Sequence, residues 1–134
     1  LRLGQQELMD SVSASVEAEK TLLLQAPTGV GKTIGVLYPM LKDSFAQGQK
    51  LLYLTAKNSQ HAVAEDAVTR LQHEGADVRS LTLLAKTKMC FKEEPVCDPT
   101  YCEYAKDHYT KIHNSKVHEE LLKKKKLNER SIKK

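Results

Sequence analysis

Residues 26–33 read APTGVGKT, an order of residue types that is suited to holding phosphate groups. Gly29 and Gly31 allow the backbone to curl so that several N–H groups point at one anion, at the start of an expected helix. Lys32 supplies a positive charge for the β- and γ-phosphates, and the Thr33 hydroxyl is a ligand for Mg²⁺. The strict form of the pattern begins with glycine, whereas this sequence has Ala26. The pattern predicts a nucleotide-binding loop made of Ala26, Pro27, Thr28, Gly29, Val30, Gly31, Lys32 and Thr33.

Hydrolysis of a bound nucleotide needs a further group besides Lys32 and Thr33. Enzymes with this loop place an acidic residue at the end of another strand, where it holds Mg²⁺ and orients water. After Thr33 no expected strand ends in an Asp–Glu pair, and Glu93–Glu94 lies away from any strand end. We therefore expect these 134 residues to bind ATP better than they hydrolyse it.

Three cysteines form a second group of chemically capable residues, with the spacing C-x6-C-x4-C. Because Cys90, Cys97 and Cys102 are the only cysteines of the sequence, they cannot all pair with one another as disulfides. The spacing also differs from the CxxC pairs that most structural zinc sites use. In a reducing compartment, such residues are more often metal ligands or buried thiols than bridges.

The elements that must position these residues alternate between helical and strand-like patterns. Apolar runs of strand length occur at residues 21–25, 50–56 and 78–85, and stretches with helical periodicity occur at residues 4–19, 31–45 and 59–74. This alternation predicts an α/β fold in which helices flank a parallel sheet. After residue 89 the alternation stops. Beyond that point, helical spacing recurs only at Tyr101, Ala105, Tyr109 and Ile112. This spacing predicts a last helix that runs into the lysine-rich end of the sequence.

The charge of the sequence is concentrated after the last cysteine. The net charge is +4, and residues 103–134 hold ten Lys and Arg against five Asp and Glu. The run Lys123–Lys126 is either a solvated helix face or a surface that contacts phosphates. No apolar run approaches the length of a membrane span, so we expect no membrane partner. Because the sequence begins with Leu, we expect it to be an excerpt of a longer protein.

With APTGVGKT in place, the sequence resembles the N-terminal part of the XPD/DinG-type iron–sulfur DNA helicases of superfamily 2, and most closely their bacterial members. The resemblance covers essentially the whole chain. Arg2 and Gln5 resemble the adenine-reading element that precedes the loop in this family. Residues 54–58, LTAKN, resemble motif Ia, which implies that Thr55, Lys57, Asn58 and Ser59 contact the backbone of single-stranded DNA. A polar loop that caps a helix at Asn58 or Ser59 would give the same pattern.

The resemblance also implies a role for the cysteines. In this family a small inserted domain carries a four-cysteine [4Fe–4S] cluster, and Cys90, Cys97 and Cys102 match its first three ligands. We expect the fourth ligand beyond Lys134, so that residues 1–88 form a partial RecA-like ATP-binding lobe and residues 89–134 a partial iron–sulfur domain. Two alternatives remain, a zinc site completed by His108 and no metal at all.

The function implied is that of an ATP-dependent DNA helicase in DNA repair or replication. Its expected cofactors are ATP, Mg²⁺ and the [4Fe–4S] cluster, and its expected partners are single-stranded DNA and duplex junctions. The expected location is the cytoplasm of a bacterium, in association with the nucleoid. Two other classes fit parts of the pattern. One is a nucleotide-binding regulatory module with a structural zinc knob and no motor activity, and the other is a phosphate-loop kinase acting on a small molecule.

Overall fold

The computed structural model describes residues 2–57 and 59–133 and divides the chain into two compact units, Leu1–Asp77 and Val78–Lys134. The first unit contains helices α1 (Gln5–Glu17), α2 (Lys32–Gln47) and α3 (Ser59–His73). The second contains β1 (Ser80–Leu81), α4 (Lys86–Met89), α5 (His108–Asn114), α6 (Val117–Lys123), β2 (Lys126–Leu127) and α7 (Glu129–Ile132).

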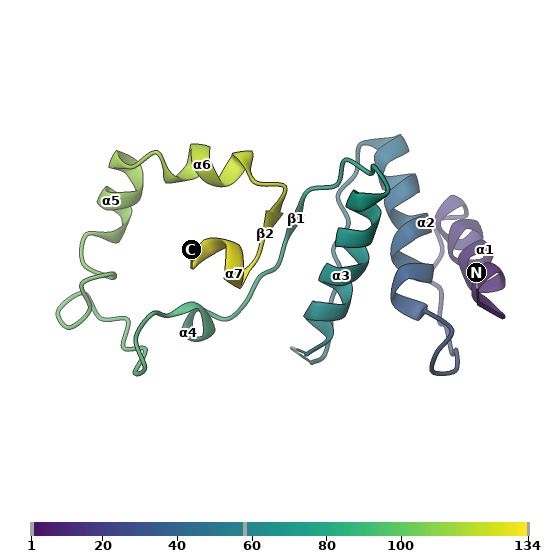
Figure 1. Ribbon diagram of the computed structural model, residues 1–134, viewed down its shortest axis with the longest axis horizontal. Helices are drawn as coiled ribbons and strands as arrows, with labels where there is room; N and C mark the ends of the chain where they lie inside the picture. Colours follow the sequence, from purple (N-terminus) through teal and green to yellow (C-terminus); the bar gives the residue numbers. More distant parts are fainter. Residues whose placement is uncertain (1, 58, 134) are drawn as a thin grey trace. The chain divides into compact units, whose positions relative to one another are not determined.

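In the first unit α2 packs against both α1 and α3, and all three helices begin at the same end of the unit (Figure 1). Leu8 and Val12 are buried on α1, as their spacing predicts. Gly35 lies on the facing side of α2, where an added Cβ would be 2.7 Å from Leu8 Cδ2. The absence of a side chain at position 35 therefore allows the two helices to approach closely.

Glycines follow the ends of α2 and α3, close to the predicted helix ends at residues 45 and 74. Gly48 has φ 65° and follows the last residue of α2, and the N–H of Gln49 donates to the Ser44 carbonyl at 2.8 Å. Gly75 has φ 94° just after α3. These left-handed residues turn the chain and satisfy carbonyls that the helix ends leave without partners. On α3, Ala67 is buried, whereas Val63, one turn before it, is 53% exposed and does not belong to the packed face.

Two of the expected strands are absent from the first unit. Residues 21–25 and 50–56 have no regular secondary structure, and they expose Leu23, Leu52 and Leu54 by 92%, 76% and 81%. A strand requires a hydrogen-bonded neighbour, and no ladder joins these two segments to any described residue. The RecA-like parallel sheet thus remains a prediction for this unit.

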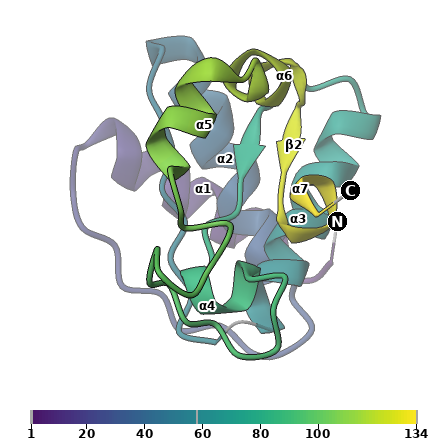
Figure 2. The same ribbon diagram turned by 90° about the vertical axis from the view of Figure 1, so that its left-hand side faces the viewer.

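The second unit contains a short parallel ladder. Ser80 pairs with Lys126 and Leu81 with Leu127, and the two strands lie side by side in Figure 2. The ladder is continued by hydrogen bonds from Ser80 N–H to the Lys125 carbonyl (2.9 Å) and from Thr82 N–H to the Leu127 carbonyl (2.8 Å). The third expected strand is therefore formed at two residues only. The cysteine-bearing segment is the crossover between two neighbouring parallel strands, and the predicted domains 1–88 and 89–134 remain an interpretation of it.

The prediction of a single helix after the cysteines is wrong. The chain forms α5 and α6 instead, with an extended Ser115 between them, and α5 is preceded by Asp107 in the left-handed region (φ 54°). Tyr101 and Tyr109 are 77% and 86% exposed, so their spacing does not mark a buried face. Backbone geometry at Asp107 and Ser115 interrupts the pattern that the apolar spacing suggests.

Candidate functional site

The loop at residues 26–33 has the backbone shape that its glycines predict. Gly29 has φ 89° and Gly31 has φ 83°, in a region that residues with a side chain rarely adopt. Gly31 immediately precedes α2, whose first residue is Lys32. The loop therefore ends at a helix N-terminus, where unpaired N–H groups and the helix dipole favour an anion.

Lys32 lies over this loop and contacts it. Its Nζ donates to the carbonyls of Ala26 and Pro27, both at 2.9 Å, although the side chain as a whole is exposed. An ammonium group carries three donors, and these two bonds tie the start of the loop to its end. Thr33 follows in the first turn of α2 and is half-buried. The cation and the hydroxyl are thus adjacent to the curled backbone.

Arg2 and Gln5 hold the same loop from the start of α1. The Arg2 guanidinium donates to the Gly29 carbonyl. Gln5 is only 7% exposed, and its Nε2 lies 3.5 Å from the Gly31 carbonyl, while its Oε1 accepts from Arg2 N–H at 3.1 Å. An added Cβ at Gly31 would lie 2.6 Å from Gln5 Nε2. Arg2 therefore contacts Gly29, and Gln5 contacts Gly31, the two left-handed glycines of the loop. Their adenine-reading role remains a prediction.

The stretch that resembles motif Ia lies at the end of the unit where α2 and α3 begin (Figure 1). Thr55 Oγ1 donates to the Lys57 carbonyl at 3.3 Å, and α3 starts at Ser59. Lys57 and Ser59 are exposed. Asn58, also predicted to contact DNA, falls outside the described residues. Lys57 and Ser59 are therefore accessible, and the contact of this stretch with DNA remains a prediction.

The three cysteines are not brought together. Cys90 is half-buried, Cys97 is exposed and Cys102 is 6% exposed. The N–H of Lys92 contacts Cys90 Sγ at 3.4 Å, and Cys97 Sγ contacts the Pro95 carbonyl at 4.0 Å, so both thiols contact nearby backbone. Among residues 2–57 and 59–133, no group of three or more His, Cys, Asp or Glu is arranged to hold a metal ion.

This placement does not fit a metal or cluster site. A four-thiolate cluster needs its donors around one centre, as does a Cys3His zinc site. His108 stacks edge-on against Tyr109, with the ring centroids 5.4 Å apart. The arrangement thus supports neither the iron–sulfur cluster nor the zinc alternative.

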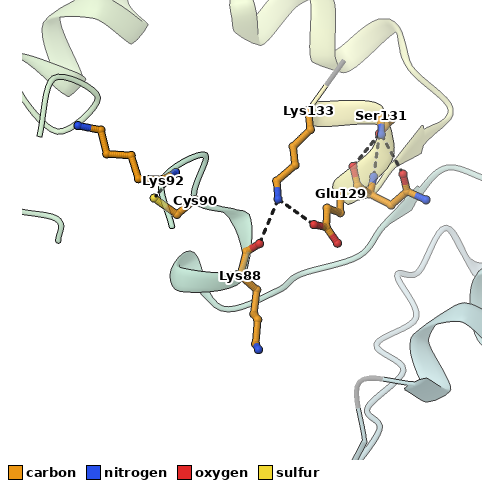
Figure 3. A network of polar contacts seen from close by, with 7 residues as sticks. Lys88, Cys90, Lys92, Glu129, Ser131 and Lys133 are labelled. Carbon is orange, nitrogen blue, oxygen red and sulfur yellow. Dashed lines mark hydrogen bonds and ion pairs between the residues drawn. The ribbon is translucent and has the colours of Figure 1, made fainter. Parts of the chain in front are cut away.

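A polar network in the second unit was not predicted from the sequence (Figure 3). Lys133 Nζ donates to Glu129 Oε1 at 2.8 Å and to the Lys88 carbonyl at 3.3 Å. At the start of α7, Asn128 and Ser131 form a capping box in which each side chain accepts the other's backbone N–H. The motif N-x-x-S could have indicated this cap, whereas the bond that ties α7 to α4 has no local signal.

Comparison with known proteins supports a helicase relationship. The chain is 29% identical, over 108 residues, to a probable ATP-dependent helicase of Methanocaldococcus jannaschii. The matched region is 79% of this chain and 16% of that protein, so the chain spans about a sixth of its relative's length. No protein-family model matches the sequence. No solved structure matches it either. Separately, no helix in the described part of the chain has the length and apolarity to cross a membrane.

Proposed function

We propose that the chain is the ATP-binding part of an ATP-dependent DNA helicase. The observation that carries this proposal is the loop itself: two left-handed glycines, a lysine at the first position of the following helix, and carbonyls held by Arg2 and Gln5. The similarity to a probable ATP-dependent helicase supports the same conclusion. Residues 26–33 would hold the phosphates of ATP.

The geometry suggests how the loop takes up its ligand. Lys32 Nζ is bonded to the carbonyls of Ala26 and Pro27, which are weaker partners than a phosphate oxygen because they are uncharged. On nucleotide binding, the ammonium would exchange at least one carbonyl for the phosphates. The Thr33 hydroxyl would be the protein ligand of a Mg²⁺ ion that otherwise keeps waters and phosphate oxygens, and the ion would neutralise phosphate charge.

We further propose that the helicase is of the XPD/DinG type, acting on DNA in the bacterial cytoplasm. Two observations support this finer assignment. The segment that leads into α3 lies at the end of the unit where α2 begins, so a strand and ATP could be bound near one another (Figure 1). The cysteine-bearing segment is a crossover between parallel strands, as an inserted domain would be. The proposed binding of ATP and of DNA does not depend on an iron–sulfur cluster.

Titration with a fluorescent ATP analogue in the presence of Mg²⁺ tests the nucleotide site. Lys32→Ala should weaken binding about 10- to 100-fold, since a hydrogen bond to a charged group contributes roughly 1.5–3 kcal/mol. The matched control is Lys42→Ala, an exposed lysine on the same helix, at a position more than two turns beyond the loop. Equal affinities of the two variants, or binding too weak to measure in the unsubstituted chain, would contradict the proposed function.

A further inference from the structure

Gln5 is packed between the start of α1 and the nucleotide loop. An added Cβ at Gly4 would lie 3.6 Å from Val30 Cγ2, and one at Gly31 would lie 2.6 Å from Gln5 Nε2, so neighbouring positions of α1 meet neighbouring positions of the loop. Gln5 and Val30 are 7% and 8% exposed. The Gln5 side chain is therefore part of the buried contact between α1 and the loop.

Both ends of the Gln5 amide already face backbone groups. Oε1 accepts from the Arg2 N–H at 3.1 Å, and the Gln5 N–H donates in return to the Arg2 carbonyl at 3.0 Å. Nε2 lies 3.5 Å from the Gly31 carbonyl. The amide thus joins the turn at residues 2–5 to the left-handed glycine that precedes α2.

Recognition of adenine by a glutamine needs a different arrangement. In a bidentate pair the amide oxygen accepts from the adenine N6 amino group while the amide nitrogen donates to N7, and both atoms must be open to the base. A buried Gln5 offers little of this edge to a ligand. Turning toward a base would also remove the contacts with the Arg2 N–H and the Gly31 carbonyl. The observed packing therefore favours the contacts with the backbone.

The groups that would hold a nucleotide at this loop do not depend on its base. They are the N–H groups at the start of α2, the Lys32 ammonium and the Thr33 hydroxyl, and each would act on a phosphate or on Mg²⁺. Phosphates and Mg²⁺ are common to all nucleoside triphosphates. A site that relies on these groups would discriminate only weakly between bases.

We propose that Gln5 is a positioning residue of the loop, and that the site takes nucleoside triphosphates irrespective of their base. The inference rests on the proposed function, because it concerns the ligand of the same loop. It gives Gln5 a role other than reading adenine. Its amide holds Gly31 in the left-handed conformation from which the loop enters α2.

The test is displacement of a ribose-labelled fluorescent ATP analogue from the 134-residue chain in the presence of Mg²⁺. The competitors are ATP, GTP, CTP and tripolyphosphate, which has no base. The test variant is Gln5→Ala. The matched control is Gln6→Ala, because Gln6 is exposed and its Nε2 donates to Asp10 within α1, at 2.8 Å. Circular dichroism checks that each variant is folded under the conditions of the titration.

ATP, GTP and CTP should bind with affinities within about 3-fold of one another, whereas a bidentate contact with adenine would give a preference of about 5- to 150-fold. Gln5→Ala should weaken all four competitors by the same factor, about 2- to 10-fold, because the loop loses a hydrogen bond that holds it. Gln6→Ala should leave the four affinities unchanged. A purely structural role of Gln5 would lower stability without changing the affinities of the folded chain.

Two results would overturn this inference and leave the proposed function intact. One is a preference for ATP over GTP and CTP of about 10-fold or more, and its loss in Gln5→Ala would return the adenine-reading role to Gln5. The other is equal affinities in Gln5→Ala and the unsubstituted chain, which would exclude the positioning role. Failure of the labelled analogue to bind the unsubstituted chain would contradict the proposed function, and this inference with it.

Discussion

The contact between Gln5 and Gly31 leads to a prediction that compares two glycines of one loop. Gly29 and Gly31 have nearly the same backbone conformation, with φ 89° and 83°. An alanine at either position must adopt a left-handed conformation, which costs about 1–2 kcal/mol. Their surroundings differ. An added Cβ meets nothing within 4 Å at Gly29, whereas at Gly31 it lies 2.6 Å from Gln5 Nε2.

Gly31→Ala should therefore destabilise the chain more than Gly29→Ala. Gln5 is 7% exposed and would have to move, giving up its contacts with the Gly31 carbonyl and Arg2 N–H. A buried polar group that loses its partners costs about 1–3 kcal/mol. The expected loss in free energy of unfolding is thus about 1–2 kcal/mol for Gly29→Ala and roughly 2–5 kcal/mol for Gly31→Ala.

Urea unfolding followed by far-ultraviolet circular dichroism measures both losses. A double-mutant cycle then isolates the contact, because Gln5→Ala removes the amide that the new methyl group would meet. We expect Gln5→Ala/Gly31→Ala to be more stable than the sum of its single changes predicts, by at least about 1 kcal/mol, and Gln5→Ala/Gly29→Ala to be additive within about 0.5 kcal/mol. Equal losses for the two glycines, together with additivity in both cycles, would refute the claim that Gln5 packs on the loop.

Two further predictions concern the cysteine-bearing segment. Iodoacetamide should alkylate Cys97 fastest, Cys90 more slowly and Cys102 slowest, in the order of their exposure. Mass spectrometry of the time course checks this order. Equal protection of all three cysteines after anaerobic addition of iron and sulfide would instead show that they bind one cluster. The pKa of Asp98 should lie below its ordinary value. The main cause is the backbone N–H of Thr100, which donates to Asp98 Oδ1 at 2.7 Å, and the second cause is a hydrogen bond with the Thr100 side chain. The ionised carboxylate then stabilises the fold above the ordinary pKa, and this contribution is lost as pH falls through the lowered pKa. An NMR titration of the Asp98 carboxyl checks this, and Thr100→Ala should keep most of the shift; a full return to the ordinary value would contradict the backbone bond as the main cause.

Features decided by residues close in sequence were predicted well. Helices α2 and α3 end just before Gly48 and Gly75, near the predicted ends at residues 45 and 74, since a glycine that adopts φ > 0 sets a helix end by itself. The conformation of Gly29 and Gly31 also follows from the local pattern. The loop contacts of Arg2 and Gln5 are different, because they depend on how α1 packs against α2.

Features that depend on distant partners were not predictable. Residues 21–25 and 50–56 have strand-like composition, but a ladder needs a neighbour that local sequence does not specify. The lysine run was predicted to continue a helix, whereas the pairing of β2 with β1 pulls Lys126 out of any helix. The bond from Lys124 Nζ to the Ser131 carbonyl at 2.7 Å depends on the turn that follows β2. The family resemblance implied shared ligation by the three cysteines, which the packing of Cys102 and the exposure of Cys97 do not produce.

The pairing of Ser80 with Lys126 and of Leu81 with Leu127 has a consequence for how this segment can change during evolution. Residues 82–125 leave one strand and return to its neighbour, so both ends of the segment are fixed next to each other. A replacement of different length or content needs to satisfy only this short closure distance and the minimum span of a parallel crossover. The ladder thus forms a graft point, at which an excursion can be lengthened, shortened or exchanged while the strands on either side keep their register.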